Sequence, residues 1–429
     1  MLITTRLREG SETRAVRIVE SGAHTNECVV HARLPYLANQ RTPNALKREF
    51  ELSTKKRARV RILATGGTIA GSADRADTAG SYTAATVSLS AILDTVPGLH
   101  ALADVDARQV AAIDSKDADP EFWQDLARHV QQALDAPDVD AVVVLHGTDT
   151  LAESAWFVEL ALAPSKTVVF TGAMRPATAL SADGPMNVLQ AVRVATDGSS
   201  RRRGVLAVMN GAIHRARFLR KAHSSHVHAF TSGAAGLEGE VFDTVNWFRP
   251  PPASPVGRLR CDGLTGRDAQ MGLPADVDTA IPGGAADVGA AVILDGDEIG
   301  YLLGTPLPRV DILVAYPGAS TDVVAHLVRA GARGIVFAGT GHGTLSGPIQ
   351  AALADARASG VAVVRASKVD EGQVGWNVGC PDHALGFMTS GGLSPDKARV
   401  ALMVRLAKEK AKEKAKGQAR SGVRALLEG

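Results

Sequence analysis

The sequence predicts an α/β protein with two domains, a larger one built on a mostly parallel sheet flanked by helices and a smaller C-terminal α/β domain. Three observations support this fold class. From residue 60 onward, apolar runs of strand length alternate with longer segments of helical periodicity, as in repeated β-α-β units. The strand-length runs are continuously apolar, which indicates a sheet covered on both faces. The chain has 429 residues, enough for two separate cores.

The larger domain is predicted over residues 59–250. Its strands are expected at 60–64, 109–113, 141–145, 167–171 and 204–209. Its helices are expected at 88–96, 120–134, 151–162 and 186–195. Ser88 is a suitable N-cap for the first helix. In the second, Phe122, Leu126 and Val130 recur at a spacing that places them on one helix face.

The smaller domain is predicted over residues 307–406. Its strands are expected at 310–314, 334–338 and 362–365, and its helices at 321–330, 348–356 and 394–406. The segment between the domains, 251–306, is rich in Pro, Gly, Ala and Asp, a composition typical of a linker or surface excursion. Residues 407–429 form a charged tail, which we expect to be a solvated helix end or disordered.

Residues 1–58 differ in composition from the rest of the chain. They are basic and show no sustained apolar periodicity, so we expect a disordered N-terminal extension. They also lack the apolar stretch of about 7–15 residues that a secretory signal needs. The cytoplasm is therefore the expected compartment.

Composition excludes several classes of function. A net charge of +2 gives no argument for nucleic acid or an acidic membrane as a partner. No apolar run approaches the roughly eighteen residues that would span a bilayer. Cys28, Cys261 and Cys380 are far apart and odd in number, so neither a disulfide framework nor a metal cluster is indicated.

Two similar runs suggest where the chemistry lies. Residues 62–71 and 142–150 each begin as a buried strand and continue into glycine and then threonine. In a parallel sheet, ligands bind beyond the carboxyl ends of strands, so Thr68 and Thr148 should lie over one crevice. Asp149 adds a carboxylate that could hold a substrate ammonium. A threonine is a weak nucleophile and needs a base or proton relay nearby. The first run lacks the lysine of a Walker motif, which argues against nucleotide binding.

These runs, ATGGTIAG at 64–71 and HGTDT at 146–150, resemble the two signature motifs of bacterial-type L-asparaginases, the asparaginase/glutaminase family. The resemblance covers about 59–250 and 307–406. It continues in other motifs, namely GAMRP at 172–176, SADGPMN at 181–187, the strand at 204–209, GF at 386–387 and LSPDKARV at 393–400.

The resemblance implies an activity. Members of this family hydrolyse L-asparagine to L-aspartate and ammonia through a threonine acyl-enzyme, so we expect a small-molecule substrate and neither a metal nor an organic cofactor. The family's sites lie between subunits of a dimer of dimers, which implies a homotetramer. Nucleic acid and membrane are not expected as partners.

The resemblance also assigns roles residue by residue. Thr68 matches the threonine that forms the acyl-enzyme, and Tyr82 matches the flap tyrosine that activates it. Thr148, Lys221 and Asp149 match a Thr-Lys-Asp relay, in which the carboxylate also holds the α-ammonium of the substrate. The other expected substrate-binding positions are Gly67, Lys116, Ser115 and Ala173. Ser115 matches the serine that binds the α-carboxylate, and Ala173 matches a backbone position near the amide being cleaved.

Three further patterns have a structural and a functional interpretation. His223, His226 and His228 could suggest a metal site, but no cysteine or paired carboxylate completes a ligand set. The glycine pattern at 339–343 is only weakly typical of a dinucleotide turn. Asp183 is expected to cap the helix that follows it rather than to take part in catalysis.

The sequence departs from the family at two places. Lys116 stands where many relatives carry glutamine, which could weaken α-amino binding or change the preference between asparagine and glutamine. A neighbouring subunit of the family contributes an asparagine and a glutamate, and these positions align with His342 and Gly379. Glu371 or Asp382 could supply the missing carboxylate. A glutamine-preferring enzyme and a weakly active amino-acid-binding homologue are therefore the alternatives.

Overall fold

A computed structural model describes residues 3–9, 12–18, 57–77, 82–251 and 296–428. The chain divides into two units, 1–56 and 57–429. In the first unit, strands β1 (Ile3–Glu9) and β2 (Glu12–Ile18) pair antiparallel. These strands are the described part of the expected N-terminal extension, and residues 19–56 lie outside the described part of the chain.

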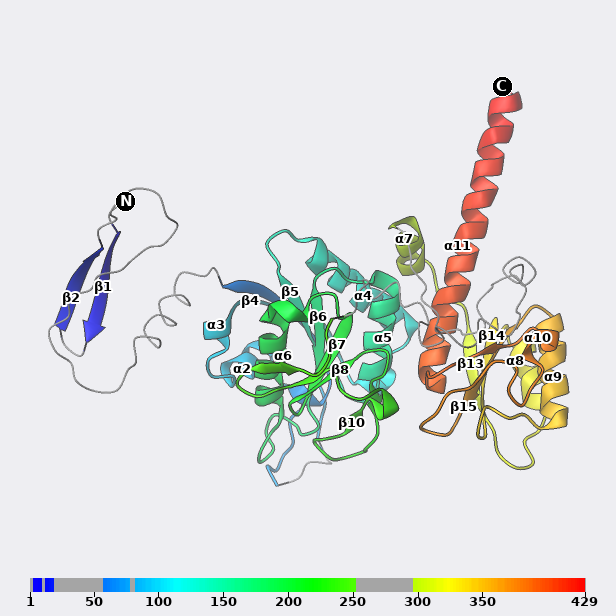
Figure 1. Ribbon diagram of the computed structural model, residues 1–429, viewed down its shortest axis with the longest axis horizontal. Coiled ribbons are helices and arrows are strands. Elements are labelled where there is room, and N and C mark those ends of the chain that lie inside the picture. Colours follow the sequence, from blue (N-terminus) through cyan, green and yellow to red (C-terminus); the bar gives the residue numbers. More distant parts are fainter. Residues whose placement is uncertain (1–2, 10–11, 19–56, 78–81, 252–295, 429) are drawn as a thin grey trace. The chain divides into compact units, whose positions relative to one another are not determined.

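The second unit contains a sheet of eight strands in the order β12-β11-β8-β7-β6-β5-β3-β4 (Figure 1). Strands β4, β3, β5, β6 and β7 run parallel, and β8, β11 and β12 extend the sheet antiparallel beyond β7. The bounds are β3 (Ala58–Gly66), β4 (Ala103–Ile113), β5 (Ala141–Leu145), β6 (Thr167–Thr171), β7 (Val205–Met209), β8 (Ala212–Arg215), β11 (Gly239–Val241) and β12 (Val245–Trp247).

Helices cover both faces of this sheet. Within β5, Val142 and Val144 face one core, and Val143 and Leu145 face the other. This explains why the strand is apolar throughout. The first core is shared with α4 (Pro120–Asp135) and α5 (Leu151–Leu162), and the second with α2 (Leu89–Asp94), α3 (Leu99–Leu102) and α6 (Gly184–Thr196). Ser88 caps α2 as predicted, because its hydroxyl accepts from the Ala91 N–H at 3.2 Å.

The strand order places the candidate residues at a topological switch point. Strand β3 lies between β4 on one side and β5 on the other. The connection from β3 to β4 therefore runs toward one edge of the sheet, and the connection from β5 to β6 runs toward the other. In open α/β sheets, a crevice forms where the order reverses, outside the carboxyl ends of the strands. Thr68 follows β3 and Thr148 follows β5. Both threonines therefore lie at this switch point.

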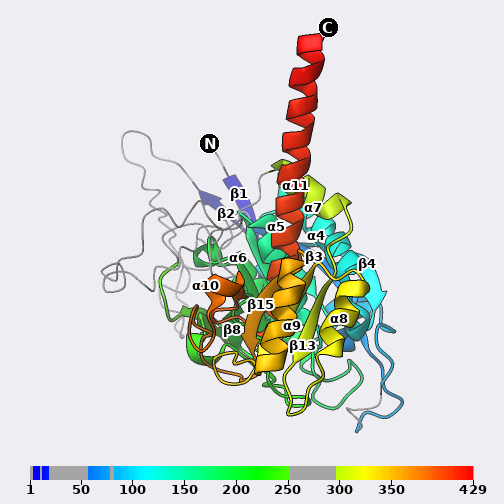
Figure 2. The same ribbon diagram turned by 90° about the vertical axis from the view of Figure 1, so that its right-hand side faces the viewer.

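The smaller domain has a parallel sheet in the order β13-β14-β15-β16. Helices α8 and α9 pack on one face, and the first turns of α11 pack on the other (Figure 2). The bounds are β13 (Val310–Val314), α8 (Asp322–Arg329), β14 (Gly334–Gly339), α9 (Gly347–Ala358), β15 (Ala362–Ser367), α10 (Asp382–Leu385), β16 (Met388–Thr389) and α11 (Pro395–Glu428).

Two segments outside the predicted domains contain helix, and in the charged tail this agrees with the first of the two expected alternatives. The helix expected at 394–406 continues as α11 through the charged tail. The excursion between the domains ends in a helix, α7 (Gly296–Gly304), which packs against α4 and α11, while 252–295 lie outside the described residues. Glu298 of α7 pairs with Lys408 of α11 at 3.3 Å. None of the described helices has the length and apolarity to cross a bilayer.

Candidate active site

The structure brings the two motif turns into direct contact. Gly67 has φ +78°, and a Cβ there would lie 2.3 Å from the Cα of Gly147. A Cβ on Gly147 would in turn lie 2.5 Å from the Ser115 hydroxyl. Only glycine fits at positions this close to another backbone. Thr68 and Thr148 each follow one of these touching glycines, so the two strand ends meet as the sequence predicted.

Thr68 contacts the tyrosine expected to activate it. The two hydroxyl oxygens of Thr68 and Tyr82 are 2.5 Å apart, and either can donate. Thr68 is 7% exposed and Tyr82 is 36% exposed. A Cβ on Gly71 would lie 2.7 Å from the tyrosine ring, so the ring lies directly over this glycine. Ser72 and Thr83 exchange backbone hydrogen bonds at 2.9 and 3.0 Å, which fixes the segment that carries the tyrosine.

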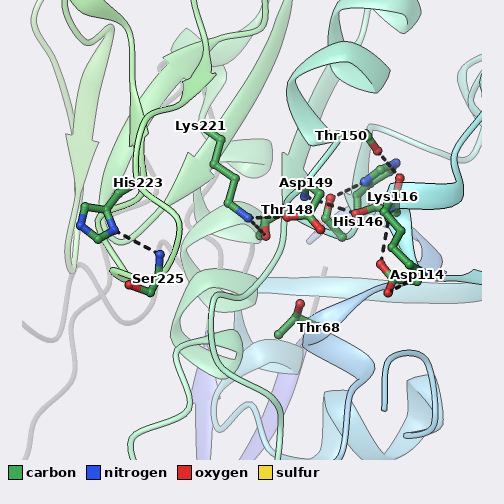
Figure 3. A network of polar contacts seen from close by, with 12 residues as sticks. Thr68, Asp114, Lys116, His146, Thr148, Asp149, Thr150, Lys221, His223 and Ser225 are labelled. Carbon is green, nitrogen blue, oxygen red and sulfur yellow. Dashed lines mark hydrogen bonds and ion pairs between the residues drawn. The ribbon is translucent and has the colours of Figure 1, made fainter. Parts of the chain in front are cut away.

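Lys221 connects the second threonine to the carboxylate. Its ammonium donates to Thr148 Oγ1 at 2.9 Å and to Asp149 Oδ1 at 2.6 Å (Figure 3). The lysine comes from β9 (Arg220–Lys221), which pairs with β10 (Phe230–Thr231). The Asp149 side chain is 55% exposed, so its ion pair with the lysine is screened by water and contributes little to stability. The open carboxylate remains able to receive a second cation.

Ser115 is buried beside the HGTDT turn. Its hydroxyl accepts from the Asp149 N–H at 3.2 Å, and its carbonyl accepts from the Thr150 hydroxyl at 2.7 Å. It begins the short 3₁₀ helix η2 (Ser115–Asp117), which Asp114 caps. The hydroxyl keeps its own proton for donation, because in these contacts it acts only as an acceptor.

The Ala173 loop is held by a residue whose role the sequence only partly predicted. The Asp183 carboxylate accepts from the N–H groups of Met174 and Arg175, both at 3.0 Å, and from the Asn187 amide at 3.1 Å. Asp183 stands at the N-cap position of α6, as predicted, but its side chain makes no capping hydrogen bond to a helix N–H and instead holds the loop before the helix. Its contacts fix the backbone that follows the buried Ala173.

Lys116 makes its polar contacts within its own turn. Its ammonium pairs with Asp117 at 2.8 Å and with Asp114 at 3.1 Å. The hydrogen bonds that the ammonium donates to Asp117, the larger effect, and to Asp114 raise the pKa of the lysine. The side chain is 61% exposed. Its extra charge relative to a glutamine is therefore largely neutralised locally.

His146, in the second motif, is a feature that sequence reasoning did not single out. It is fully buried against Phe122 and Phe170, and its Nδ1 lies 2.7 Å from the Gly147 carbonyl oxygen. A carbonyl only accepts, so Nδ1 carries the proton. Its Nε2 has no hydrogen-bond partner among the described residues. Burial lowers the pKa of this histidine to about 4, and the ring is neutral at pH 7.

The histidine cluster does not assemble a metal site. His223 and His226 stack with ring centroids 3.5 Å apart, and the N–H groups of Ser225 and His226 donate to Nδ1 of His223. Figure 3 shows His223 on the far side of Lys221 from the threonines. Across the described ranges, no three His, Cys, Asp or Glu side chains are grouped to hold a metal ion.

The positions aligned with the family's cross-subunit residues lie in the small domain around one buried arginine. Arg365 pairs with Asp382 through both carboxylate oxygens, at 2.5 and 2.6 Å, and both side chains are fully buried. The guanidinium also donates to the His342 carbonyl at 2.8 Å. Asp382 is thus unavailable to a substrate, whereas Glu371 is exposed. Gly379, at φ +71°, contributes no side chain.

Both domains of the chain resemble those of known proteins. The profile of the N-terminal asparaginase domain matches residues 59–253, and the profile of the glutaminase/asparaginase C-terminal domain matches 309–418. A crystal structure of a probable cytoplasmic L-asparaginase from Campylobacter jejuni superposes with a TM-score of 0.67 at 34% identity, covering 83% of this chain and 98% of that one.

Curated relatives give the same result. L-asparaginase 2 of Escherichia coli strain K12 is 35% identical, and the match covers 82% of this chain and 89% of that protein. L-asparaginase 2 of Bacillus subtilis strain 168 is 34% identical, and the match covers 81% of this chain and 82% of that protein. The glutaminase-asparaginase of Pseudomonas fluorescens biotype A is 35% identical over 85% and 90%. With both domain profiles matched in order and such relatives along most of its length, the chain belongs to the asparaginase family of amidohydrolases.

Proposed function

We propose that the protein hydrolyses L-asparagine to L-aspartate and ammonia through an ester on Thr68. The observation that carries this proposal is the 2.5 Å contact between the Thr68 and Tyr82 hydroxyls at the strand switch point. It gives a buried hydroxyl a proton-relay partner, which a threonine nucleophile requires. The names of the relatives, L-asparaginase and glutaminase-asparaginase, support the substrate class.

Substrate recognition would use the opposite charges at the second turn. The α-ammonium would pair with the exposed carboxylate of Asp149, and the α-carboxylate would accept from the Ser115 hydroxyl. These groups are close together, since the Asp149 N–H donates to the Ser115 oxygen at 3.2 Å. The side-chain amide would then extend toward Thr68, between the backbones of Gly67 and Ala173.

The first half of the reaction would form the ester. Thr68 Oγ1 would attack the amide carbonyl while its proton passes to the Tyr82 oxygen, which gives its own phenolic proton to the amide nitrogen. The carbon–nitrogen bond would then break, and the nitrogen would leave as ammonia. Backbone N–H groups near the touching glycines would stabilise the oxyanion, a kind of contact whose removal costs about 2.7–4 kcal/mol in comparable sites. Water would then cleave the ester and return the proton to Thr68.

Lys221 would orient Thr148 in this scheme. An ammonium can only donate, so Thr148 Oγ1 accepts from the lysine at 2.9 Å and its own hydroxyl proton points elsewhere. That proton is then available to the substrate or to the attacking water. The positive charge beside the hydroxyl also lowers the cost of removing the proton.

Glutamine is the second candidate substrate, because a relative named glutaminase-asparaginase is as similar as the relatives named L-asparaginase. An ammonia-release assay with purified protein on both amides tests the proposal. We expect release from both, with the larger kcat/KM for asparagine. A larger value for glutamine would reassign the main substrate, and no release from either would favour a binding or regulatory homologue.

We further propose that the protein assembles as a dimer of dimers and acts in the cytoplasm. The assembly is proposed because the small-domain loops around His342 lie at positions that the family uses across a subunit boundary. Light scattering on the purified protein should give four times the mass of the 44.7 kDa chain. A monomeric mass with full activity would contradict this assembly.

A further inference from the structure

The short turn that presents Lys221 is buried and tightly folded. Strand β8 ends at Arg215, whose carbonyl accepts from the N–H groups of Phe218 and Leu219, both at 3.0 Å. The N–H of Ala216 donates to the Val205 carbonyl at 2.9 Å. Ala216 and Leu219 are fully buried. The lysine follows within two residues of this turn, so its position depends on how the turn is held.

The small domain of the same chain holds the start of this turn. Lys397, in the first turn of α11, is 2% exposed, and its ammonium donates to the Ala216 carbonyl. Its own carbonyl accepts from the Trp156 indole N–H of α5 at 3.2 Å. A buried ammonium is costly unless it is hydrogen-bonded, and its burial lowers the pKa of Lys397 to about 7. This contact therefore resists movement of either partner.

A second contact holds the other end of the turn. Arg220, next to Lys221, donates to the carbonyl oxygen of Asp370 and to its carboxylate at 3.1 Å. The Asp370 side chain is 89% exposed, so this ion pair is screened and weak. Of the two small-domain contacts, the buried one from Lys397 is the more rigid.

We propose that Lys397 is a positioning residue for the reaction, which acts by holding the Ala216 carbonyl so that the Lys221 ammonium reaches Thr148 and Asp149. Through this contact, α11 of the small domain determines the geometry of a relay in the large domain of the same chain. Misplacement of a reacting group by about 1 Å can cost about 10²-fold in rate. The kinetic test of this positioning role rests on the proposed function, because it measures turnover.

The kinetic test compares three variants. Lys397→Met removes the ammonium but keeps an apolar side chain of similar length, Lys397→Gln keeps a hydrogen-bond donor, and Arg399→Met is the matched control. Arg399 lies on the same helix and also donates to a backbone carbonyl, that of Val310 at 2.8 Å, away from the turn. We expect kcat to fall about 10- to 100-fold in Lys397→Met, less in Lys397→Gln, and under about threefold in Arg399→Met, with KM little changed.

A labelling experiment tests the same inference without turnover. Each protein is treated briefly with an amine-acylating reagent, and modification of Lys221 is measured by peptide mass spectrometry. Held by Thr148 and Asp149, Lys221 should react slowly in the wild type and in Arg399→Met, and several-fold faster in Lys397→Met. Should that variant fail to fold, Lys397→Gln replaces it with a smaller increase expected.

The two experiments separate the possible failures. A wild type that releases no ammonia overturns the proposed function, and the labelling of Lys221 still decides the positioning role. Unchanged labelling of Lys221 in a folded Lys397 variant overturns the positioning role. Equal losses of kcat in Lys397→Met and Arg399→Met also overturn it, because they would show a general effect of loosening α11.

Discussion

The hydroxyl oxygens of Thr68 and Tyr82 lie 2.5 Å apart, with the threonine buried and the tyrosine at the surface. If the tyrosine relays the nucleophile's proton, Tyr82→Phe should lower kcat by about 10²-fold, the lower end of what proton transfer by a positioned group contributes. KM and the melting temperature should barely change, because the ring still covers Gly71. Steady-state kinetics and thermal unfolding measure these effects, and a variant with more than half the wild-type kcat would contradict the relay.

Lys221 should affect turnover more than binding. Lys221→Met removes the donor to Thr148 and frees the Asp149 carboxylate for the substrate ammonium. We expect kcat to fall by about 10²-fold, with KM unchanged or lower, since the lost interaction supports the transition state. Lys221→Arg, which keeps the charge but changes the geometry, should retain part of the rate. A rise in KM with kcat unchanged would instead assign this lysine to substrate binding.

Lys116 should affect turnover little, although it stands where many relatives carry an uncharged glutamine. Its ammonium is paired with Asp114 and Asp117 and is largely exposed. Lys116→Gln should therefore change kcat/KM for asparagine by less than about threefold, because an exposed ion pair is screened by water and its removal has little effect. The ratio of kcat/KM for asparagine and glutamine is the measurement. A tenfold shift in that ratio would show that the lysine reaches the substrate.

His146 should make the protein sensitive to acid. Its pKa is about 4 in the fold and about 6.5 in an unfolded chain, so between these pH values the unfolded state binds the extra proton. Stability should therefore fall as pH decreases from 6.5 to 4, by up to about 1.4 kcal/mol per pH unit from this group. His146→Asn, which does not titrate, should lack this component. Urea unfolding of both proteins from pH 4 to 7.5 measures it, and parallel curves would contradict it.

The central strands and helices could be predicted from sequence because each carries its own pattern. Strands β5 and β6 are apolar at every position except the first and last residues of β6, which are threonines. The bounds of both strands and of α5 were predicted correctly. The antiparallel extension β8, β11 and β12 was missed. Its strands have only three or four residues, with polar side chains such as His214 and Asn246 among them, and so carry too little periodicity to identify.

The site could be predicted only in part, for a similar reason. Thr68 and Thr148 follow recognisable strand ends, so their meeting follows from the topology of a parallel sheet. The contact between Lys221 and Thr148 spans 73 residues and has no local pattern, so it came from the family resemblance alone. Lys397 lies in another domain, and its link to Ala216 spans 181 residues. Such contacts are fixed by tertiary packing, which no sequence periodicity encodes.

The most direct test of the account is ammonia release from L-asparagine by Thr68→Ala beside the wild type. The substitution removes the attacking oxygen and leaves Tyr82, Thr148, Asp149 and Lys221 in place. We predict that kcat falls about a thousandfold or more, as expected when a covalent nucleophile is lost. Release within tenfold of the wild-type rate by a folded variant would contradict the assignment of Thr68 as the nucleophile.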